Sequence, residues 1–515
     1  MKKNDYLLLS ATGAYSFLFY QQNAGINFFL FNLAFLSVLF IRNNELLKSK
    51  KWYWSAAMCL ISSACIFIHS SALSIVANIL SLILLAGISY NTLTSSLFAF
   101  LFSGFSLASS VVFIIMDAVK RANKPPGEME NKKGYKVFAG LIVLFLTVLF
   151  FVMYQSANPL FADNTKWINL NFLSFKWIAF TLGGFILVYG LFYHKTVSLI
   201  TRWENSLSIY NQQANQLNLK QFEAERFAGV LLFVMLNLML LILNIGDVNT
   251  LYFLGSLPKG ISHSDFVHNG VGVIIFSIMV ATALIMYLFR SDFKHIKQNA
   301  LFKALAYAWI FQNIIMLSST ALRNQMYIHT YDFTYKRIGV YVWLLLAVIG
   351  LVIVFLKLKQ ERSNWFLIKS NVAVWFSVLT LSACFNWDKI ITNYNLQNKP
   401  LSQVDFPYLL SLSEANIPQL KIISESKEFI ALYEKQTRIH MAYQAEQKNL
   451  NSLNNYSTTR MNGLQELIKT NHNLFCGDRN YYDCLNDKIK EYVESYTNDW
   501  RSFDLRDKEI VKYIY

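Results

Sequence analysis

Residues 318–337 read SSTALRNQMYIHTYDFTYKR and stand between two long apolar runs. Arg323, Tyr327, Tyr331 and Tyr335 recur at every fourth position of this stretch. Residues four apart share one face of a helix, so the spacing predicts a face that carries one cation and three phenols. The flanking runs are long enough to cross a bilayer as helices, and the stretch is therefore expected to be the polar connection between two membrane spans.

Apolar runs of this kind recur along the whole chain. Hydrophobic residues make up 54% of the sequence and charged residues only 15%, against about 25% in soluble domains. The runs lie near residues 6–20, 25–41, 53–69, 71–91, 94–118, 137–155, 172–193, 227–249, 271–289, 300–320, 338–356 and 370–386. The pattern predicts an all-α, polytopic membrane helix bundle with 11–13 spanning helices.

The charge distribution separates the chain into two predicted domains. The net charge is +15, yet residues 387–515 hold 16 Lys and Arg against 17 Asp and Glu, so the excess belongs to residues 1–386. Basic residues flank membrane spans on the cytoplasmic side, which makes the lipid bilayer the expected partner and not a nucleic acid. We therefore expect a membrane domain over 1–386 and a soluble helical domain over 387–515.

Loop charges orient the second half of the chain. The connections 120–136, 194–226, 290–297 and 357–369 hold 17 Lys and Arg, whereas the alternating connections 156–171, 250–270 and 321–337 hold five. The positive-inside rule places the first set in the cytoplasm, and the C-terminal domain then lies outside it.

The first half of the chain does not fit the same rule. Lys51 and Lys120 are both expected inside, which requires an even number of crossings between them, but three apolar segments lie there. Either one of these segments is re-entrant or the region folds with a different number of spans.

The C-terminal domain shows helical patterning and one cysteine pair. Leu485, Ile489 and Tyr492 begin an apolar stripe at helical spacing, and Phe429 belongs to another. Cys476 and Cys484 enclose a short loop, CGDRNYYDC, that an oxidising compartment would close as a disulfide. Two unpaired thiols, or a metal site with His472, are the alternatives.

Two further sets of residues are candidate sites. Arg323, Tyr327, Tyr331, Tyr335 and Arg337 form a candidate site for an anionic ligand or headgroup, because Arg is a bidentate donor and phenols donate at the interface. An aromatic belt that anchors a helix end is the simpler interpretation.

The second set, His263, Asp265 and His268, is a weak metal candidate, and ordinary loop residues are the simpler interpretation. No cofactor is expected.

Several blocks, in order, resemble the bacterial membrane proteins catalogued as domain of unknown function 4153/4173. The blocks are Ser156–Phe161, Ser264–Gly270, Arg323–Arg337, Asn386–Asn395 and Asp499–Phe503. Thr334 joins the candidate site through this resemblance, and Asp332-Phe333 stand where the family carries Gly-Leu. The resemblance implies a polytopic helical protein of the bacterial cytoplasmic (inner) membrane, in a family without an established activity.

Three classes of function remain open. No Asp, Glu, Lys or Arg lies at the centre of a predicted span, and the chain lacks the phosphate-loop, nucleophile-elbow and H-E-x-x-H motifs. These absences favour a non-enzymatic sensory or scaffolding component whose outer helical domain binds a protein partner. A transporter or lipid-handling protein that engages anionic headgroups is the alternative, and an enzyme acting on a lipid-linked substrate is the third.

Overall fold

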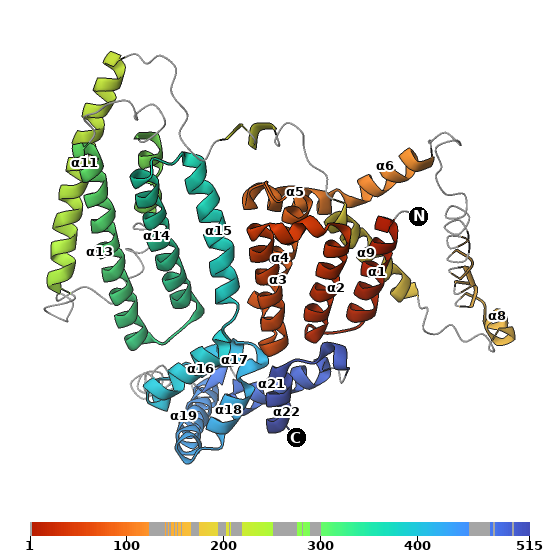
Figure 1. Ribbon diagram of the computed structural model, residues 1–515. Coiled ribbons are helices and arrows are strands. Elements are labelled where there is room, and N and C mark those ends of the chain that lie inside the picture. The colour runs from red at the N-terminus through yellow and green to blue at the C-terminus, as the bar shows by residue number, and fades with distance from the viewer. Residues whose placement is uncertain are drawn as a thin grey trace. The chain divides into compact units, whose positions relative to one another are not determined.

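A computed structural model of the chain describes most of its residues (Figure 1). The described residues are 3–122, 140, 143, 146–148, 150–151, 153–155, 157–165, 175–193, 202–204, 206–207, 219–250, 276–280, 282–288, 300–452, 474–476, 479–496 and 499–514. They form helices throughout, apart from one pair of two-residue strands. The predicted all-α class is confirmed.

The chain divides into two compact units that interleave along the sequence. Unit 1 comprises Met1–Ser206, Leu379–Cys384 and Thr497–Asp507. Unit 2 comprises Leu207–Val378, Phe385–Tyr496 and Lys508–Tyr515. The two units are described separately below. The predicted domains, 1–386 and 387–515, are a different division and stay a prediction.

Unit 1 is built on consecutive antiparallel helices (Figure 1). Its helices are α1 (Lys3–Phe19), α2 (Ile26–Arg42), η1 (Asn44–Lys48), α3 (Lys50–His69), α4 (Ala72–Tyr90), α5 (Ser96–Ala108), α6 (Ser110–Ala122), α8 (Pro159–Asn164) and α9 (Phe175–Phe192), with η7 (Trp500–Ser502) and the start of α22 (Leu505–Ile514) from the C-terminal region. Serine side chains begin three of these helices. Ser49, Ser71 and Ser95 each accept a hydrogen bond from a backbone N–H of the first turn, which satisfies one of the free donors there.

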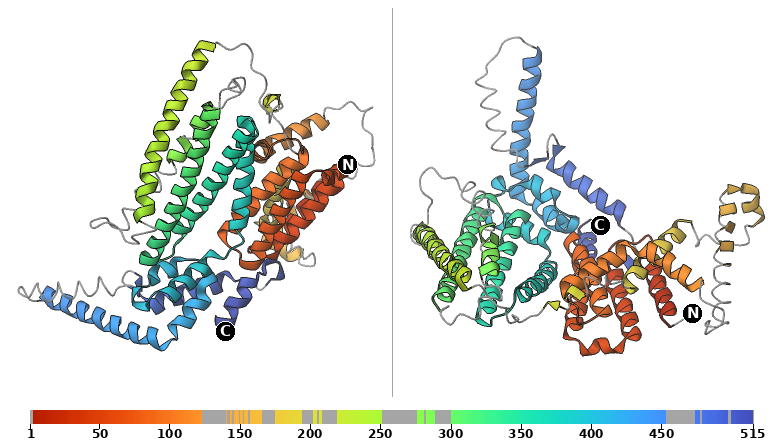
Figure 2. Two further views of the ribbon diagram at one scale, coloured as in Figure 1. Left: turned by 60° about the vertical axis from the view of Figure 1, so that its left-hand side comes forward. Right: turned by 90° about the horizontal axis from the view of Figure 1, so that it is seen from above.

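The membrane-like part of unit 2 consists of long helices that stand side by side (Figures 1 and 2). These are α11 (Leu219–Val248), α13 (Ala300–Tyr331), α14 (Tyr335–Lys359) and α15 (Asn364–Ser382), of which α15 ends in unit 1. Phe302, Trp309, Leu317 and Leu351 are buried in the core that they share.

The C-terminal region of unit 2 has a core of its own. Its elements are α16 (Trp387–Asn398), η5 (Leu401–Gln403), α17 (Phe406–Ser411), η6 (Glu414–Asn416), α18 (Ile417–Ser424), α19 (Lys427–Ser452), β1 (Phe475–Cys476), β2 (Arg479–Asn480), α21 (Tyr481–Ser495) and the end of α22. Phe406, Phe429 and Tyr481 are fully buried and meet ring against ring, with centroids 4.7–5.4 Å apart. The predicted apolar stripes around Phe429 and Leu485 are confirmed, since both residues lie in this core.

The described residues include six helices long and apolar enough to cross a membrane. They are α3, α4, residues 227–248 of α11, α13, α14 and α15. A seventh span would result if α5 and α6 were one broken crossing, but they are bent by 72° relative to each other. The predicted number of 11–13 includes segments near 137–155 and 271–289, which lie partly outside the described residues, and it stays a prediction.

Candidate functional site

The candidate Arg/Tyr residues surround a sharp corner between α13 and α14. Helix α13 continues to Tyr331, and α14 begins at Tyr335. Asp332, between the two helices, has φ 103°, a conformation in which glycine is favoured. The expectation that Tyr335 shares one helix face with Arg323, Tyr327 and Tyr331 is therefore wrong, because the chain reverses after Tyr331.

Arg337 closes this corner from its α14 side. Its guanidinium lies over the ring of Tyr327, 4.3 Å from the centroid, and donates to the backbone carbonyl of Asp332. The amide of Asn324 donates in turn to the carbonyl of Arg337 at 3.1 Å. Tyr327 is buried, and its ring lies 4.7 Å from that of Tyr331, which is exposed. The cation of Arg337 is thus engaged by the corner itself.

Arg323 is engaged by a neighbouring helix. It forms an ion pair with Asp247 at the end of α11, and each side chain is only 11% exposed. Further polar contacts join the same two helices: Gln312 donates to Asn237 at 2.7 Å, and Asn244 donates to the carbonyl of Gln312 at 3.0 Å. Hydrogen bonds of this kind hold helices together in an apolar environment.

Helix α16 docks on the corner through reciprocal hydrogen bonds. The backbone N–H of Phe333 donates to the side chain of Asn395 at 2.7 Å, and the Asn395 amide donates back to the carbonyl of Phe333 at 3.0 Å. Asp388 accepts from the phenol of Tyr335 at 2.8 Å and from the hydroxyl of Ser413 at 2.5 Å. The C-terminal region therefore supplies hydrogen-bond partners for backbone groups of the turn that would otherwise be unpaired.

An ion pair completes the same contact. Lys399 lies 2.8 Å from the carboxylate of Asp332, with the two side chains 10% and 11% exposed. Lys399 also donates to the carbonyl of Thr330 at 3.1 Å. Burial raises the pKa of Asp332 above its ordinary value, and the neighbouring Lys399 opposes that shift.

The structure brings five of the six candidate residues together at this corner, whereas Arg323 pairs with Asp247 of α11. We call these five residues, with Asp332, Asp388, Asn395 and Lys399, the corner joint. Thr334 contributes its carbonyl, which accepts from the N–H groups of Arg337 and Ile338 in the first turn of α14. Local spacing could not reveal Asp388, Asn395 and Lys399 as partners of the corner. Asp388 and Asn395 had a signal only in the family-like block after the last span.

The C-terminal region also carries the cysteine pair. The thiols of Cys476 and Cys484 are hydrogen-bonded to each other, and burial together with this contact raises the pKa of Cys476 to about 12. Strands β1 and β2 pair antiparallel, with Cys476 opposite Arg479, and α21 brings Cys484 back beside them. The disulfide stays a prediction.

The proposed metal residues cannot be placed. His263, Asp265 and His268 lie outside the described residues. Among the residues that are described, no group of three or more His, Cys, Asp or Glu side chains could hold a metal ion.

A second joint, in unit 1, was not predicted. The Asp499–Phe503 segment packs on the connection between α1 and α2. Ile26 donates its N–H to the carbonyl of Phe503 at 2.9 Å, and Arg501 donates to the carbonyl of Phe17 at 2.7 Å. Gly25 is required here, because a Cβ atom on it would lie 2.4 Å from the carbonyl oxygen of Ser502.

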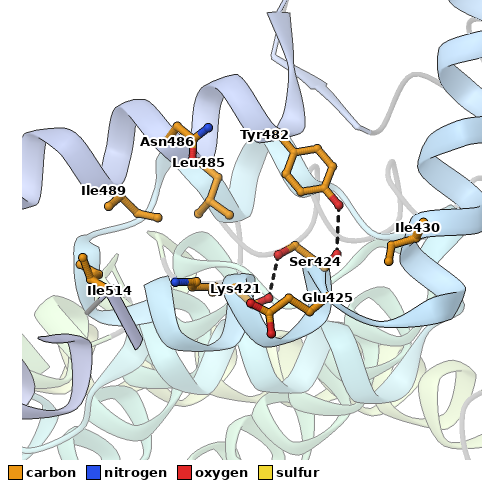
Figure 3. A pocket seen from close by; sticks show the side chains of 9 residues that line it. All are labelled: Lys421, Ser424, Glu425, Ile430, Tyr482, Leu485, Asn486, Ile489 and Ile514. Atoms are coloured by element: carbon orange, nitrogen blue, oxygen red, sulfur yellow. Dashed lines mark hydrogen bonds between the residues drawn. The ribbon is translucent and has the colours of Figure 1, made fainter. Parts of the chain in front are cut away.

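A hollow of about 610 Å³ lies among the C-terminal helices (Figure 3). It is lined by Lys421, Ser424, Glu425, Ile430, Tyr482, Leu485, Asn486, Ile489 and Ile514. Tyr482 spans one end of it and donates to the carbonyl of Ser424 at 3.0 Å. Its lining combines apolar side chains with one cation and one carboxylate, a mixture that is common at protein-binding surfaces.

The long apolar helices and the helical C-terminal region define a multi-span membrane protein. The chain belongs to the family described as a domain of unknown function (DUF4153), whose model matches residues 25–422. The resemblance seen in the sequence is confirmed. No curated protein and no solved structure matches the chain significantly.

Proposed function

We propose that the protein is a non-enzymatic sensory or scaffolding component of the bacterial cytoplasmic membrane, with an extracytoplasmic helical domain that binds a protein partner. The observation that carries this proposal is the corner joint. Its residues use their polar groups to hold the C-terminal region on α13 and α14, as an anchored binding domain requires.

The contacts of Arg323 and Arg337 weaken the support for the alternative function, a transporter or lipid-handling protein that engages anionic headgroups. An anionic headgroup site would need Arg323 or Arg337 to offer its guanidinium to a ligand. Arg323 is paired with Asp247, and Arg337 lies on Tyr327 and donates to the corner. A ligand would have to displace these partners, and breaking a buried ion pair costs about 3–5 kcal/mol.

The charges of each unit support an extracytoplasmic C-terminal region. In unit 2 the C-terminal helices contact the α13–α14 corner, whereas the basic residues Lys357 and Lys359 lie in the last turn of α14, at its opposite end. In unit 1 the Asp499–Phe503 segment contacts the α1–α2 connection, at the end of α1 away from Lys3. In both units the basic ends lie away from the C-terminal region, as the positive-inside rule requires for an outer domain.

The hollow of Figure 3 is the proposed partner surface, and cross-linking in living cells tests it. A photoreactive residue at Asn486, in the wall of the hollow, should form a discrete adduct with a second protein. The same residue at Arg438, an exposed position on α19 that does not line the hollow, is the matched control. The adduct at 486 should disappear when Glu425→Lys reverses the charge beside it. No adduct at 486, or equal adducts at both positions, would contradict the proposal.

A further inference from the structure

Helix α6 has its polar face inward and its apolar face outward. Asp117 accepts a hydrogen bond from the phenol of Tyr189 in α9 at 2.6 Å, and Ser110 is buried. The opposite face is entirely apolar, with every side chain between 45% and 58% exposed; it consists of Val111, Val112, Ile115, Met116 and Val119. This is the reverse of a helix that faces water, and it fits a helix whose outer face contacts lipid.

The preceding helix, α5, lies at the basic end of unit 1. This end is defined by three contacts of basic side chains. Lys3 donates to the carbonyl of Ile41 at 2.6 Å, Arg42 to that of Phe192 at 2.5 Å, and Lys51 to that of Leu93 at 3.2 Å. The start of α1, the ends of α2 and α9, and the residues just before α5 therefore share one end of the unit.

Both halves of α5 stay at that end. A Cβ atom on Gly87, three residues before the end of α4, would lie 2.1 Å from the carbonyl oxygen of Ala99. A Cβ atom on Gly190, two residues before the end of α9, would lie 2.8 Å from Cα of Leu107. Helix α5 thus crosses over the ends of α4 and α9 and does not descend between them, as Figure 1 shows.

This placement of α5 and α6 reconciles the loop charges in the first half of the chain with the number of membrane crossings. With α5 and α6 at the basic end, α3 and α4 are the two crossings between Lys51 and Lys120, which is the even number that the charges require. The segment predicted as a span over 94–118 becomes the bent pair of α5 and α6.

We propose that α6 is a bilayer-surface helix that binds the anionic headgroup layer at the basic end of unit 1. Its Val/Ile/Met face enters the boundary between headgroups and acyl chains, and the exposed Lys120 at its end meets the lipid phosphates. The six Lys and Arg of residues 120–136 give the same stretch of chain a strong positive charge. The partner is a lipid surface and not a protein groove, because five exposed apolar side chains lie at the same end of the unit as the basic side chains of Lys3, Arg42 and Lys51.

Depth measurements on the full chain in vesicles test the orientation. Nitroxide labels at Val112→Cys and Val119→Cys, in a variant whose five native cysteines are replaced by alanine, report immersion through collisions with oxygen and with a water-soluble nickel complex. Seven residues of a helix span about 10 Å, so a helix along the membrane normal would place the two labels about 10 Å apart in depth. A surface helix should place both at one shallow depth. Arg438→Cys, at a side chain 78% exposed in the C-terminal region, is the control for water.

Two results would overturn the orientation. A depth difference near 10 Å would make α6 part of a span, and accessibility equal to that of the label at position 438 would put α6 in water. Both labelled positions are exposed, so the labels enter no core.

The lipid chemistry has its own test. Replacing phosphatidylcholine with phosphatidylglycerol should increase the immersion of both labels, and Lys120→Gln should reduce that increase. Identical depths in the two lipids would overturn the assignment of anionic headgroups.

Discussion

Asp332→Gly tests the corner joint, because the substitution has two opposing effects. Asp332 has φ 103°, which a glycine adopts with less strain than an aspartate. Its carboxylate, however, is the partner of Lys399 at 2.8 Å, and both side chains are nearly buried. We expect Asp332→Gly to destabilise the joint, because the free energy lost with the ion pair exceeds the free energy gained when the backbone strain at positive φ is relieved.

The expected change in the free energy of unfolding follows from the loss of the ion pair and the relief of backbone strain. Removing one member of a buried ion pair costs about 3–5 kcal/mol, and relieving a positive φ returns about 1–2 kcal/mol. The net loss is about 1–4 kcal/mol, which corresponds to a fall of about 2–16 °C in Tm at about 2–4 °C per kcal/mol. Adding Lys399→Met removes the uncompensated cation, so the double variant should unfold within about 1 kcal/mol of the parent protein.

The reactivity of Cys484, which is buried in α21, can report the thermal unfolding of this region. In a variant that keeps Cys484 as its sole cysteine, a thiol-reactive dye added during heating in detergent follows the opening of the C-terminal core. Asp332→Gly, Lys399→Met and the double variant form a cycle with the parent. Additive effects, or an Asp332→Gly variant as stable as the parent, would refute the coupling and with it the corner joint.

Three further outcomes are expected. Gly25→Ala should destabilise unit 1 by about 1–3 kcal/mol, because its Cβ would strike backbone of the Asp499–Phe503 segment, whereas Gly13→Ala, with open space around it, should not; equal melting of the two would contradict the contact. Burial raises the pKa of Asp504 from 3.8 to about 7, so the folded chain binds more protons across that window, and stability should fall as the pH rises from 3.8 to 7; Asp504→Asn should flatten this dependence in thermal melts, and an unchanged slope would refute the cause. A membrane-impermeant thiol reagent should label Cys476, which is half-buried, in intact cells only after reduction, if the C-terminal region is extracytoplasmic and the disulfide to Cys484 forms; labelling only after lysis would place Cys476 in the cytoplasm.

Membrane helices were the most predictable part of the fold. Spans are apolar for about 20 residues because every backbone group in lipid must be paired within the helix. Composition alone therefore located α3, α4, α14 and α15 to within a few residues. The C-terminal stripes around Phe429 and Leu485 were predicted by the same reasoning, since an amphipathic helix repeats its buried face at a fixed spacing.

Spacing failed where the chain changes direction. Tyr335 continues the four-residue spacing of Arg323, Tyr327 and Tyr331, yet it belongs to the next helix. Helix α13 ends before it, because Asp332 adopts a positive φ. The spacing of residues predicts which side chains share a face only while the helix continues. It does not predict where the helix ends and the chain turns back. The family-like block carries glycine where this chain has Asp332, and this difference argued against a tight turn; the structure keeps the turn with Asp332 at positive φ.

The apolar segment over 94–118, which folds as two short helices bent by 72°, shows a related limit of composition. Its composition matches that of a span, and hydropathy does not distinguish a crossing from two short helices that lie along one end of a bundle. The distinction depends on contacts such as that of Gly87 with Ala99 and of Gly190 with Leu107, which join residues far apart in sequence. The mismatch in loop charges was the single sequence signal that pointed to it.

The positions of the family-like blocks bear on where an activity should be sought. The block around Arg323–Arg337 meets the block around Asn386–Asn395 in the corner joint, through Phe333 with Asn395 and Tyr335 with Asp388. These blocks therefore describe how the helical C-terminal region is held, which is a requirement of the architecture in any member that shares it. A partner or ligand should instead be sought on surfaces that these contacts leave open. Two such surfaces are the hollow beside Tyr482 and the outer face of α6, and the experiments proposed for each are independent of the other.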